Sequence, residues 1–150
     1  MANTFTNLLY HIVFSTKHRK PLIDESLRNE LYPYIGGIIR GERGILLEIG
    51  GIADHIHIVA KLKADSSVAD IVRLVKANSS KWSNQRLKRK STFGWQTGYA
   101  AFTVSESQLA AVRSYVRNQE RHHRKLTFQQ EYVALLRKHG IEFDPQYLWD

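Results

Sequence analysis

The sequence predicts an α+β fold built on an antiparallel four-stranded sheet. Four short segments are rich in apolar and β-branched residues, and two longer segments between them carry apolar residues at helical spacing. Their order is β-α-β-β-α-β followed by two more helices, which is the ferredoxin-like arrangement with helices on one face of the sheet. The chain has 150 residues, 43% of them hydrophobic, which suits one buried core. We therefore expect residues 1–150 to form a single domain, with the C-terminal helices added to the sheet.

The first strand and the first helix are marked by their ends. Residues 8–14 form an apolar, β-rich run that the segment 17–21, ending in proline, interrupts. Asp24 is suited to cap a helix that runs to about Arg40, and Gly41 and Gly44 suit its exit. The apolar stripe of this helix consists of Leu27, Leu31, Tyr34, Ile35 and Ile38.

The next two strands are predicted on either side of a glycine pair. Residues 45–49 should form the second strand, and Gly50-Gly51 should let the backbone bend before Asp54. Residues 55–62 should form the third strand. Its side chains should alternate, with Ile56 and Ile58 on one face and His55, His57 and Val59 on the other.

The helix after the third strand begins at a pattern that resembles a capping box, Ser67 with Asp70. It should continue through Trp82, with a bend at Ser79-Ser80, and give way to a basic loop. One face of this helix carries Val68, Ile71, Val72 and Val75.

The fourth strand, residues 99–104, is followed by two pairs with capping-box spacing. Ser105 with Gln108 should begin a helix that carries Tyr115 and Gln119. Thr127 with Gln130 should begin a last helix that ends at Gly140.

Basic residues are concentrated in three groups, and the net charge of +8 with a pI near 9.8 favours a polyanionic partner. A solvated surface would explain any one group, but three groups, one of them around Tyr115, favour a nucleic acid. The groups are Lys17-His18-Arg19-Lys20; Lys81, Arg86, Lys88, Arg89 and Lys90; and Arg113, Arg117, Arg121, Arg124 and Lys125.

Features absent from the sequence disfavour several classes of protein. There is no cysteine, which excludes disulfides and thiolate metal sites. No apolar run approaches the roughly 18 residues of a membrane span, and the N-terminus lacks the pattern of a signal peptide. No P-loop or glycine-rich dinucleotide signature is present, so no nucleotide cofactor is expected. We expect a cytoplasmic protein that is associated with the nucleoid when bound to DNA.

His55 and His57 are candidate metal ligands. One residue separates them, so on a strand both imidazoles point to the same side and can bind one ion. Ile56 and Ile58 would hold the opposite face in the core. Taken alone, the pair is also compatible with chance or a structural role, and two ligands do not complete a metal site.

Tyr115 and Gln119 lie at i and i+4, so they share one face of the predicted helix. The amide oxygen of Gln119 is a hard, neutral donor suited to Mg²⁺ or Mn²⁺. Arg113 and Arg117 give Tyr115 a cationic setting that suits a phosphate. A phenol with a pKa of about 10 is a weak nucleophile at neutral pH, and a nearby metal ion would favour the phenolate. Together these residues predict a phosphotyrosine linkage, although each alone would be ordinary on a helix.

Other histidines and tyrosines receive structural roles. Tyr132 is a competing nucleophile, but its apolar neighbours indicate a packed helix. His122 and His123 point about 100° apart on a helix, so they should not bind one ion together. We assign them to a solvated or DNA-facing turn, and His11, in an apolar strand, to the core.

Several motifs occur in one order over nearly the whole chain. They are Asp54-His55-Ile56-His57-Ile58; Ser79-Ser80-Lys81-Trp82; Trp95-Gln96-x-Gly98-Tyr99-x-Ala101-Phe102; Tyr115-Val116-Arg117-Asn118-Gln119-Glu120-x-His122-His123; Glu131-Tyr132; Leu135-Leu136; and Tyr147-Leu148-Trp149. In this order they resemble the IS200/IS605-type transposases, which are single-tyrosine enzymes of the HUH endonuclease superfamily. Ala53 stands where many relatives have proline, a difference that affects loop stiffness rather than chemistry.

The resemblance implies a metal-dependent enzyme that cuts and rejoins single-stranded DNA with hairpins near the element ends. It implies that His55, His57 and Gln119 bind Mg²⁺ or Mn²⁺, and that Tyr115 becomes joined to the 5′ phosphate. It also implies a homodimer with composite active sites. We therefore expect the histidine pair of one subunit to meet the tyrosine helix of the other.

The residues expected to contact DNA are Lys81, Arg86, Lys88, Arg89, Lys90, Trp95, Arg113 and Arg117. The cations would bind the DNA backbone. Trp95 would stack on an unpaired base. For both Trp82 and Trp95, packing within the protein is slightly favoured over stacking. Two alternatives stay open. One is a host-adopted relative acting on repeated palindromes, and the other is a non-catalytic, ferredoxin-like nucleic-acid-binding module that forms no covalent product.

Overall fold

The computed structural model describes residues 3–87 and 92–149. Its strands are β1 (Leu8–Ser15), β2 (Ile45–Ile52), β3 (His55–Leu62) and β4 (Ala100–Val104). Its helices are α1 (Glu25–Gly41), α2 (Val68–Leu87), α3 (Leu109–Arg117), α4 (Gln119–His122) and α5 (Phe128–Lys138), with short 3-10 turns at Lys17–Arg19, Glu106–Gln108 and Pro145–Tyr147.

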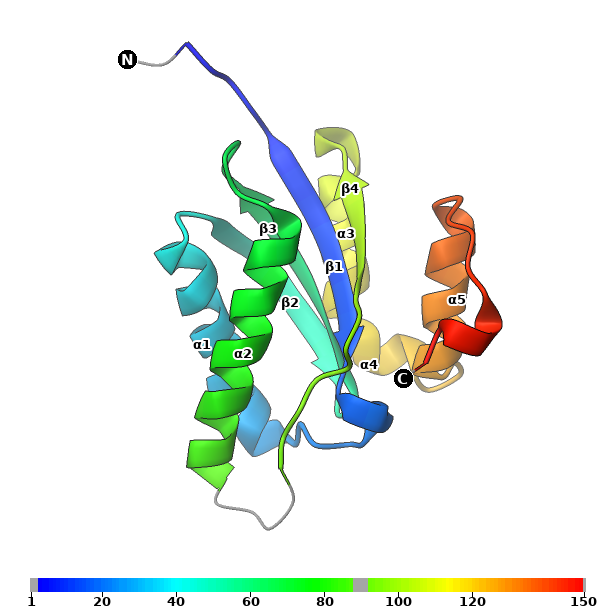
Figure 1. Cartoon of the computed structure of the whole chain (residues 1–150). Coiled ribbons are helices and arrows are strands. Elements are labelled where there is room, and N and C mark those ends of the chain that lie inside the picture. The colour runs from blue at the N-terminus through cyan, green and yellow to red at the C-terminus, as the bar shows by residue number, and fades with distance from the viewer. Residues whose placement is uncertain (1–2, 88–91, 150) are drawn as a thin grey trace.

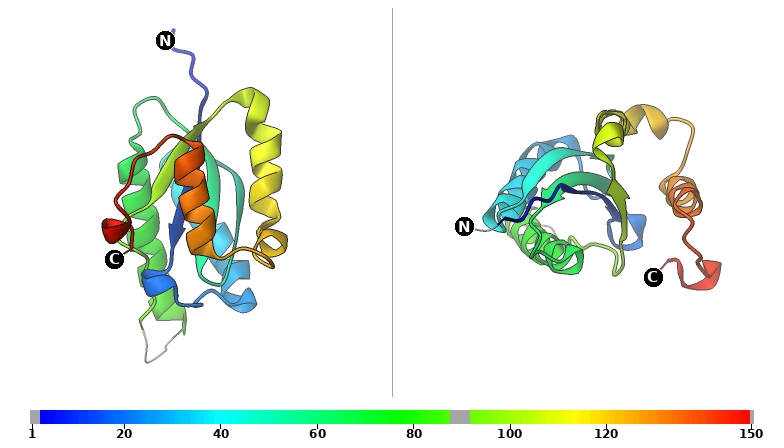
Figure 2. Two further views of the ribbon diagram at one scale, coloured as in Figure 1. Left: turned by 90° about the vertical axis from the view of Figure 1, so that its right-hand side faces the viewer. Right: turned by 90° about the horizontal axis from the view of Figure 1, so that it is seen from above.

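The four strands form one antiparallel sheet in the order β2-β3-β1-β4, which confirms the ferredoxin-like prediction. Helices α1 and α2 lie side by side over one face of the sheet, while α3, α4 and α5 lie on its other side (Figure 1). Seen from above, the sheet is a curved layer between these two groups of helices (Figure 2).

The two faces of strand β3 carry different kinds of side chain, apolar toward α1 and α2 and polar toward the C-terminal helices. Ile56 and Ile58 are buried in the apolar core beneath α1 and α2. His55 and His57 are also fully buried, but they face the C-terminal helices. The predicted alternation is therefore confirmed. It places both imidazoles on a strand that is hydrogen-bonded on both edges.

Three of the predicted helix starts are confirmed by their hydrogen bonds. The Asp24 carboxylate accepts the N–H of Leu27 at 2.8 Å, and the Ser67 hydroxyl accepts the N–H of Asp70 at 3.1 Å. Thr127 and Gln130 form the reciprocal bonds of a capping box at the start of α5. These bonds satisfy N–H groups that have no partner inside the helix.

The capping box predicted at Ser105 and Gln108 is wrong. The Ser105 side chain makes no capping bond and instead lies 3.1 Å from the hydroxyl of Ser107. A 3-10 turn occupies these positions, and α3 begins only at Leu109.

Replacing Thr127 with alanine should lower the free energy of unfolding by about 1 kcal/mol, because the start of α5 loses its side-chain cap. Urea unfolding followed by circular dichroism measures the change. Thr4→Ala, at an exposed position outside any element, is the matched control and should unfold like the parent protein. Equal stability of the two variants would show that the cap contributes nothing.

The backbone bend predicted at Gly50-Gly51 is also wrong, because β2 continues to Ile52. The glycines instead permit two close approaches. A Cβ atom on Gly50 would lie 2.1 Å from the carbonyl oxygen of Val116, and one on Gly51 would lie 2.1 Å from that of His55. Gly50 therefore lets α3 dock directly on the backbone of β2.

Helix α2 runs as one helix past Ser79-Ser80 and beyond Trp82 to Leu87, where the sequence predicted a bend and then a loop. The ring of Trp82 stacks on that of Tyr34 in α1, with 4.7 Å between centroids. This contact packs the predicted end of α2 against α1, and the helix continues beyond it to Leu87.

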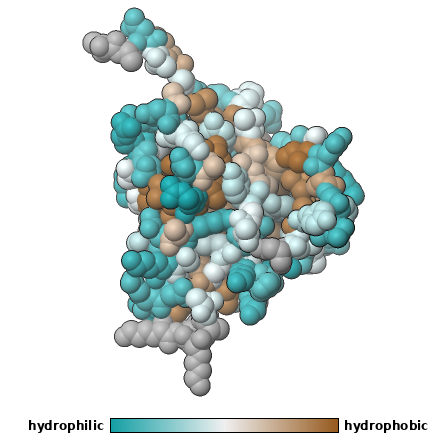
Figure 3. All heavy atoms as spheres, in the orientation of Figure 1, coloured by the Kyte–Doolittle hydropathy of each residue, from teal (hydrophilic) through white to brown (hydrophobic). Residues whose placement is uncertain are grey.

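The face shown in Figure 3 is mostly hydrophilic, with apolar side chains exposed in separate patches, the larger of them toward α5. Within residues 3–87 and 92–149, no helix is long and apolar enough to cross a membrane.

Candidate active site

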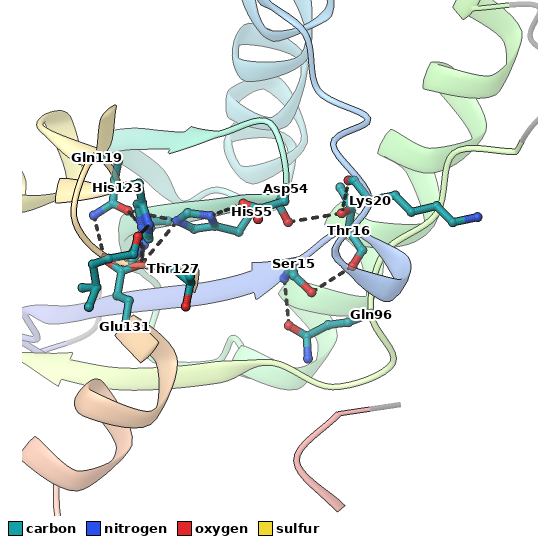
Figure 4. A network of polar contacts seen from close by, with 12 residues as sticks. Ser15, Thr16, Lys20, Asp54, His55, Gln96, Gln119, His123, Thr127 and Glu131 are labelled. Carbon is teal, nitrogen blue, oxygen red and sulfur yellow. Dashed lines mark hydrogen bonds and ion pairs between the residues drawn. The ribbon is translucent and has the colours of Figure 1, made fainter. Parts of the chain in front are cut away.

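A buried polar cluster lies between the sheet and the C-terminal helices. Figure 4 shows part of it, with His55, Gln119, His123 and Glu131 pointing toward one another. Its members are His11 from β1, His55 and His57 from β3, Tyr115 from α3, Gln119 from α4, His123 just after α4, and Glu131 from α5. We call these seven residues the Glu131 cluster.

Glu131 is the centre of this cluster. Its Oε1 atom lies 3.0 Å from Nε2 of His57 and 3.3 Å from Nε2 of His55. The same oxygen lies 3.0 Å from Nε2 of His123. Its Oε2 atom accepts hydrogen bonds from the amide of Gln119, at 3.0 Å, and from the hydroxyl of Tyr115. One oxygen thus faces the histidines, and the other faces the tyrosine helix.

The donor atoms of His55, His57 and Glu131 lie within 4.8 Å of one another and fit a divalent metal ion. Neighbouring ligands of an octahedral ion, each about 2.1 Å from it, are separated by about 3 Å. The separations from Glu131 Oε1 to the two imidazoles have this size. Oε1 of Gln119 lies 2.9 Å from Nε2 of His55, so it is available beside the same three donors.

Hydrogen bonds behind the two imidazoles fix their orientation. Nδ1 of His55 lies 2.8 Å from a carboxylate oxygen of Asp54, and Nδ1 of His57 lies 2.8 Å from Nε2 of His11. Both Nε2 atoms are therefore directed at Glu131. Partners of this kind hold a histidine ring in place for a metal.

The electrostatics of the cluster favour an ionised Glu131. Burial opposes ionisation, but hydrogen bonds with His123 and the two strand histidines hold its pKa well below the usual carboxyl range. Burial alone would lower the pKa of His55, yet hydrogen bonds to Asp54 and Glu131 outweigh it and raise this pKa to about 9. Burial lowers the pKa of His57, and burial together with His57 lowers the pKa of His11 to about 3. The cluster thus combines an ionised carboxylate with one histidine whose pKa is raised, His55, and two whose pKa values are lowered, His57 and His11.

Tyr115 lies at the rim of the cluster. Its ring is edge-on to those of His57, at 5.8 Å, and His11, at 6.2 Å. Burial and the hydrogen bond to Glu131 raise the pKa of its hydroxyl, so the phenol keeps its proton in this arrangement. A cavity of about 610 Å³, lined also by Phe102 and His139, gives access to Tyr115.

Tyr115 and Gln119 do not lie on one continuous helix as predicted. Helix α3 ends at Arg117, the backbone of Asn118 leaves the helical range, and α4 begins at Gln119. The Asn118 side chain donates a hydrogen bond to the carbonyl of Ser114 at this junction. Tyr115 and Gln119 nevertheless both reach Glu131.

In the single chain, the histidine pair lies beside the chain's own tyrosine helix. Helix α3 docks on its own sheet through the contact between Val116 and Gly50. Glu48 of β2 also binds Arg113 at 3.3 Å and Arg117 at 2.9 Å. These contacts hold α3 against its own sheet in the single chain, while the homodimer with composite active sites stays a prediction.

The structure adds Glu131 and His123 to the residues singled out from the sequence. His123 was assigned to a solvated or DNA-facing turn, but its side chain is buried against Glu131 and Gln119. Glu131 had no assigned role. A signal for it existed, because it lies three residues after Phe128 and four before Leu135, so a charge interrupts an apolar helix face. His11 is a buried core histidine, as predicted.

Of the residues expected to contact DNA, Lys81 is exposed on α2 and Arg86 forms an ion pair with Glu30. Arg113 and Arg117 are the two arginines held by Glu48. The remaining cations, Lys88, Arg89 and Lys90, lie outside the described residues.

The proposed stacking role of Trp95 is corrected by its position. The indole is 9% exposed, packs edge-on against Phe14 and Phe93, and donates its N–H to the hydroxyl of Ser79 at 2.9 Å. A ring enclosed in this way cannot stack on a base, so Trp95 is a core residue.

Comparison with known proteins agrees with this architecture. Residues 4–119 match the sequence profile of the family described as "Transposase IS200 like". The transposase for insertion sequence element IS200 of Salmonella typhimurium is 26% identical over 124 residues, which cover 79% of this chain and 81% of that protein. The corresponding protein of Salmonella typhi matches to the same extent.

Two solved structures share the fold. A Deinococcus radiodurans protein assigned as a transposase has a TM-score of 0.65 at 22% identity, over 79% of this chain and 95% of that chain. A REP-associated tyrosine transposase bound to a REP hairpin has a TM-score of 0.56 at 12% identity, over 77% of this chain and 68% of that chain. Because the family profile spans most of the sequence, the chain belongs to the IS200-like transposases, a family of enzymes that cut and join DNA.

Proposed function

We propose that this chain cuts and rejoins single-stranded DNA at hairpin-bearing element ends, through a 5′-phosphotyrosine intermediate formed on Tyr115. The observation that carries the proposal is the hydrogen bond from the Tyr115 hydroxyl to Glu131. The same carboxylate lies 3.0 Å from His57, a candidate metal ligand. A nucleophile and a set of metal donors are therefore within one hydrogen bond of each other.

His55, His57 and Glu131 would hold Mg²⁺ or Mn²⁺, with Gln119 beside them. Such an ion, when bound, would polarise a phosphodiester oxygen and neutralise the negative charge that develops on the oxygens around phosphorus. The donor set fits this role because it is buried, prearranged and made of nitrogen and oxygen ligands. Gln119 as a ligand, implied by the resemblance, stays a prediction.

The proposed reaction exchanges one phosphoester bond for another. The hydroxyl oxygen of Tyr115, oriented by its hydrogen bond to Oε2 of Glu131, attacks phosphorus while its proton passes to water. A bond from tyrosine oxygen to phosphorus forms while the bond from phosphorus to the 3′ oxygen breaks. The free 3′ end takes up a proton from water. Attack by another 3′ hydroxyl on the phosphotyrosine reverses these changes and rejoins the strand.

The proposed substrate is DNA on two grounds. The chain carries a net charge of +8, which favours a polyanion. The REP-associated tyrosine transposase that shares the fold is bound to a hairpin in its structure. We further propose that the protein acts as a homodimer.

The experiment is incubation with a single-stranded hairpin oligonucleotide and Mg²⁺ or Mn²⁺, followed by a denaturing gel. We expect a covalent protein–DNA adduct that forms with metal and is absent when EDTA is present, because the buried donors need an ion to act on the phosphate. An unstructured oligonucleotide of the same length is the control.

Metal-independent binding with no adduct on any hairpin would contradict the proposal and favour the non-catalytic binding module. Cleavage confined to repeated palindromes that lack paired element ends would instead identify the host-adopted alternative.

A further inference from the structure

A second polar site lies on the other side of α4 from the Glu131 cluster. It is a cavity of about 360 Å³ between α1, β2 and the α3–α4 segment. Four arginines line it, namely Arg28, Arg117, Arg121 and Arg124, together with Tyr32 of α1. We call it the arginine pocket.

The charge of the arginine pocket is strongly positive. Glu120 is the one carboxylate among its lining residues, and it binds Arg28 at 2.9 Å. Arg117 is paired with Glu48. Within the part of the chain that the structure describes, Arg121 and Arg124 have no carboxylate partner. Two guanidinium groups, each able to bind a phosphate with two parallel hydrogen bonds, are therefore available.

Tyr32 supplies a second, independent observation. Its hydroxyl oxygen is buried and has no hydrogen-bond partner among the described residues. Buried hydroxyls in proteins nearly always have a partner. Tyr32 lies one helical turn after Arg28, so its hydroxyl and that guanidinium belong to the same wall of the pocket. Because this oxygen has no exposed surface in the free protein, a shift of the Tyr32 side chain toward the pocket would be needed for a phosphate oxygen to provide the missing acceptor.

The pocket and the Glu131 cluster share one short segment. Gln119 and His123 face the cluster, whereas Arg117, Arg121 and Arg124 face the pocket. Tyr115 and Arg121 are six positions apart, on either side of the break at Asn118, so their backbones are at most about 22 Å apart. One extended strand of DNA can therefore contact both sites.

We propose that the arginine pocket binds a backbone phosphate of the DNA strand whose scissile phosphate lies at Tyr115. This inference rests on the proposed function, because it takes single-stranded DNA as the partner. The pocket is a binding subsite and not part of the reacting centre. It fixes where along the strand Tyr115 attacks, by holding a linkage a short distance from the cut.

The first test measures the salt dependence of hairpin binding in the Tyr115→Phe background with EDTA, where no cleavage occurs. The double variant Arg121→Gln/Arg124→Gln should reduce the slope of log affinity against log salt by about 0.7 for each phosphate that the arginines no longer neutralise. Arg73→Gln/Arg137→Gln removes the same charge from exposed sites outside the pocket and should leave the slope nearly unchanged. Equal slopes in the two double variants would overturn the proposal.

A second test locates the phosphate. Neutral methylphosphonate linkages are placed one at a time along the hairpin oligonucleotide, and binding to both proteins is measured. We expect one position at which the neutral linkage weakens binding by the parent protein severalfold but has no further effect on Arg121→Gln/Arg124→Gln. Additive effects at every position would show that these arginines bind no particular phosphate.

Tyr32→Phe separates a built subsite from general electrostatics, because it changes no charge. It should weaken DNA binding severalfold while leaving the melting temperature of the free protein equal or higher, since the hydroxyl that it removes has no partner there. Unchanged DNA affinity would remove Tyr32 from the site. Adduct formation by the parent protein, measured separately, reports on the proposed function, so the two proposals fail independently.

Discussion

Replacing Tyr115 with phenylalanine should abolish the covalent protein–DNA adduct, lowering its rate of formation by at least about 1000-fold. The variant keeps the ring that packs against His11 and His57 but lacks the oxygen that attacks phosphorus. Binding to hairpin DNA should persist, because the arginines around the site are untouched. Adduct formation on a denaturing gel and fluorescence anisotropy in EDTA measure the two properties separately.

Tyr132→Phe is the matched control. Tyr132 follows Glu131 directly, yet its ring is buried against Phe128, with 5.3 Å between centroids, and points into the apolar layer. This variant should form the adduct at nearly the parental rate. An adduct that survives in Tyr115→Phe and disappears in Tyr132→Phe would reverse the assignment of the nucleophile.

The parts of the fold that sequence could predict are those set by local periodicity. The alternation of His55, Ile56, His57 and Ile58 requires only that residues 55–62 form a strand with one apolar face. The same reasoning assigns Leu27, Leu31 and Ile35 to the buried face of α1. Strand order then follows from the β-α-β-β-α-β pattern, because few topologies satisfy it.

The parts that sequence could not predict depend on contacts between distant segments. Glycines at Gly50-Gly51 are compatible with a bend as well as with close packing, and only the position of Val116 decides between them. Trp95 follows a basic segment, which suggests exposure, yet Ser79 and Phe14 enclose it. No local pattern encodes either outcome.

The site residues also divide into those that local motifs predict and those that depend on the folded structure. The metal pair and the tyrosine could be assigned from motifs. His123 lies four positions after Gln119 and contacts it, so helical spacing was a local signal for His123 that the adjacent His122 obscured. The docking of α3 on its own sheet in the single chain involves Glu48, which binds Arg113 and Arg117 across more than sixty positions of sequence.

Glu131→Gln should lower the affinity of the free protein for Mn²⁺ by at least about 10-fold and reduce adduct formation at least as much. The substitution keeps the size of the side chain but removes the negative charge that lies within 3.3 Å of both His55 and His57. It also removes the carboxylate that orients the Tyr115 hydroxyl by accepting its hydrogen bond. Isothermal titration with Mn²⁺ in the absence of DNA measures the first effect without relying on activity.

Two further variants make this result interpretable. Glu142→Gln removes an exposed carboxylate and should bind Mn²⁺ like the parent protein. Glu131→Asp keeps the negative charge on a shorter side chain, so it should recover part of the Mn²⁺ affinity. Thermal unfolding of both Glu131 variants checks that a loss of affinity does not come from a folding defect. If Glu131→Gln bound Mn²⁺ normally while Gln119→Ala did not, the ligand set would be His55, His57 and Gln119. Glu131 would then serve only to orient the histidines and the Tyr115 hydroxyl.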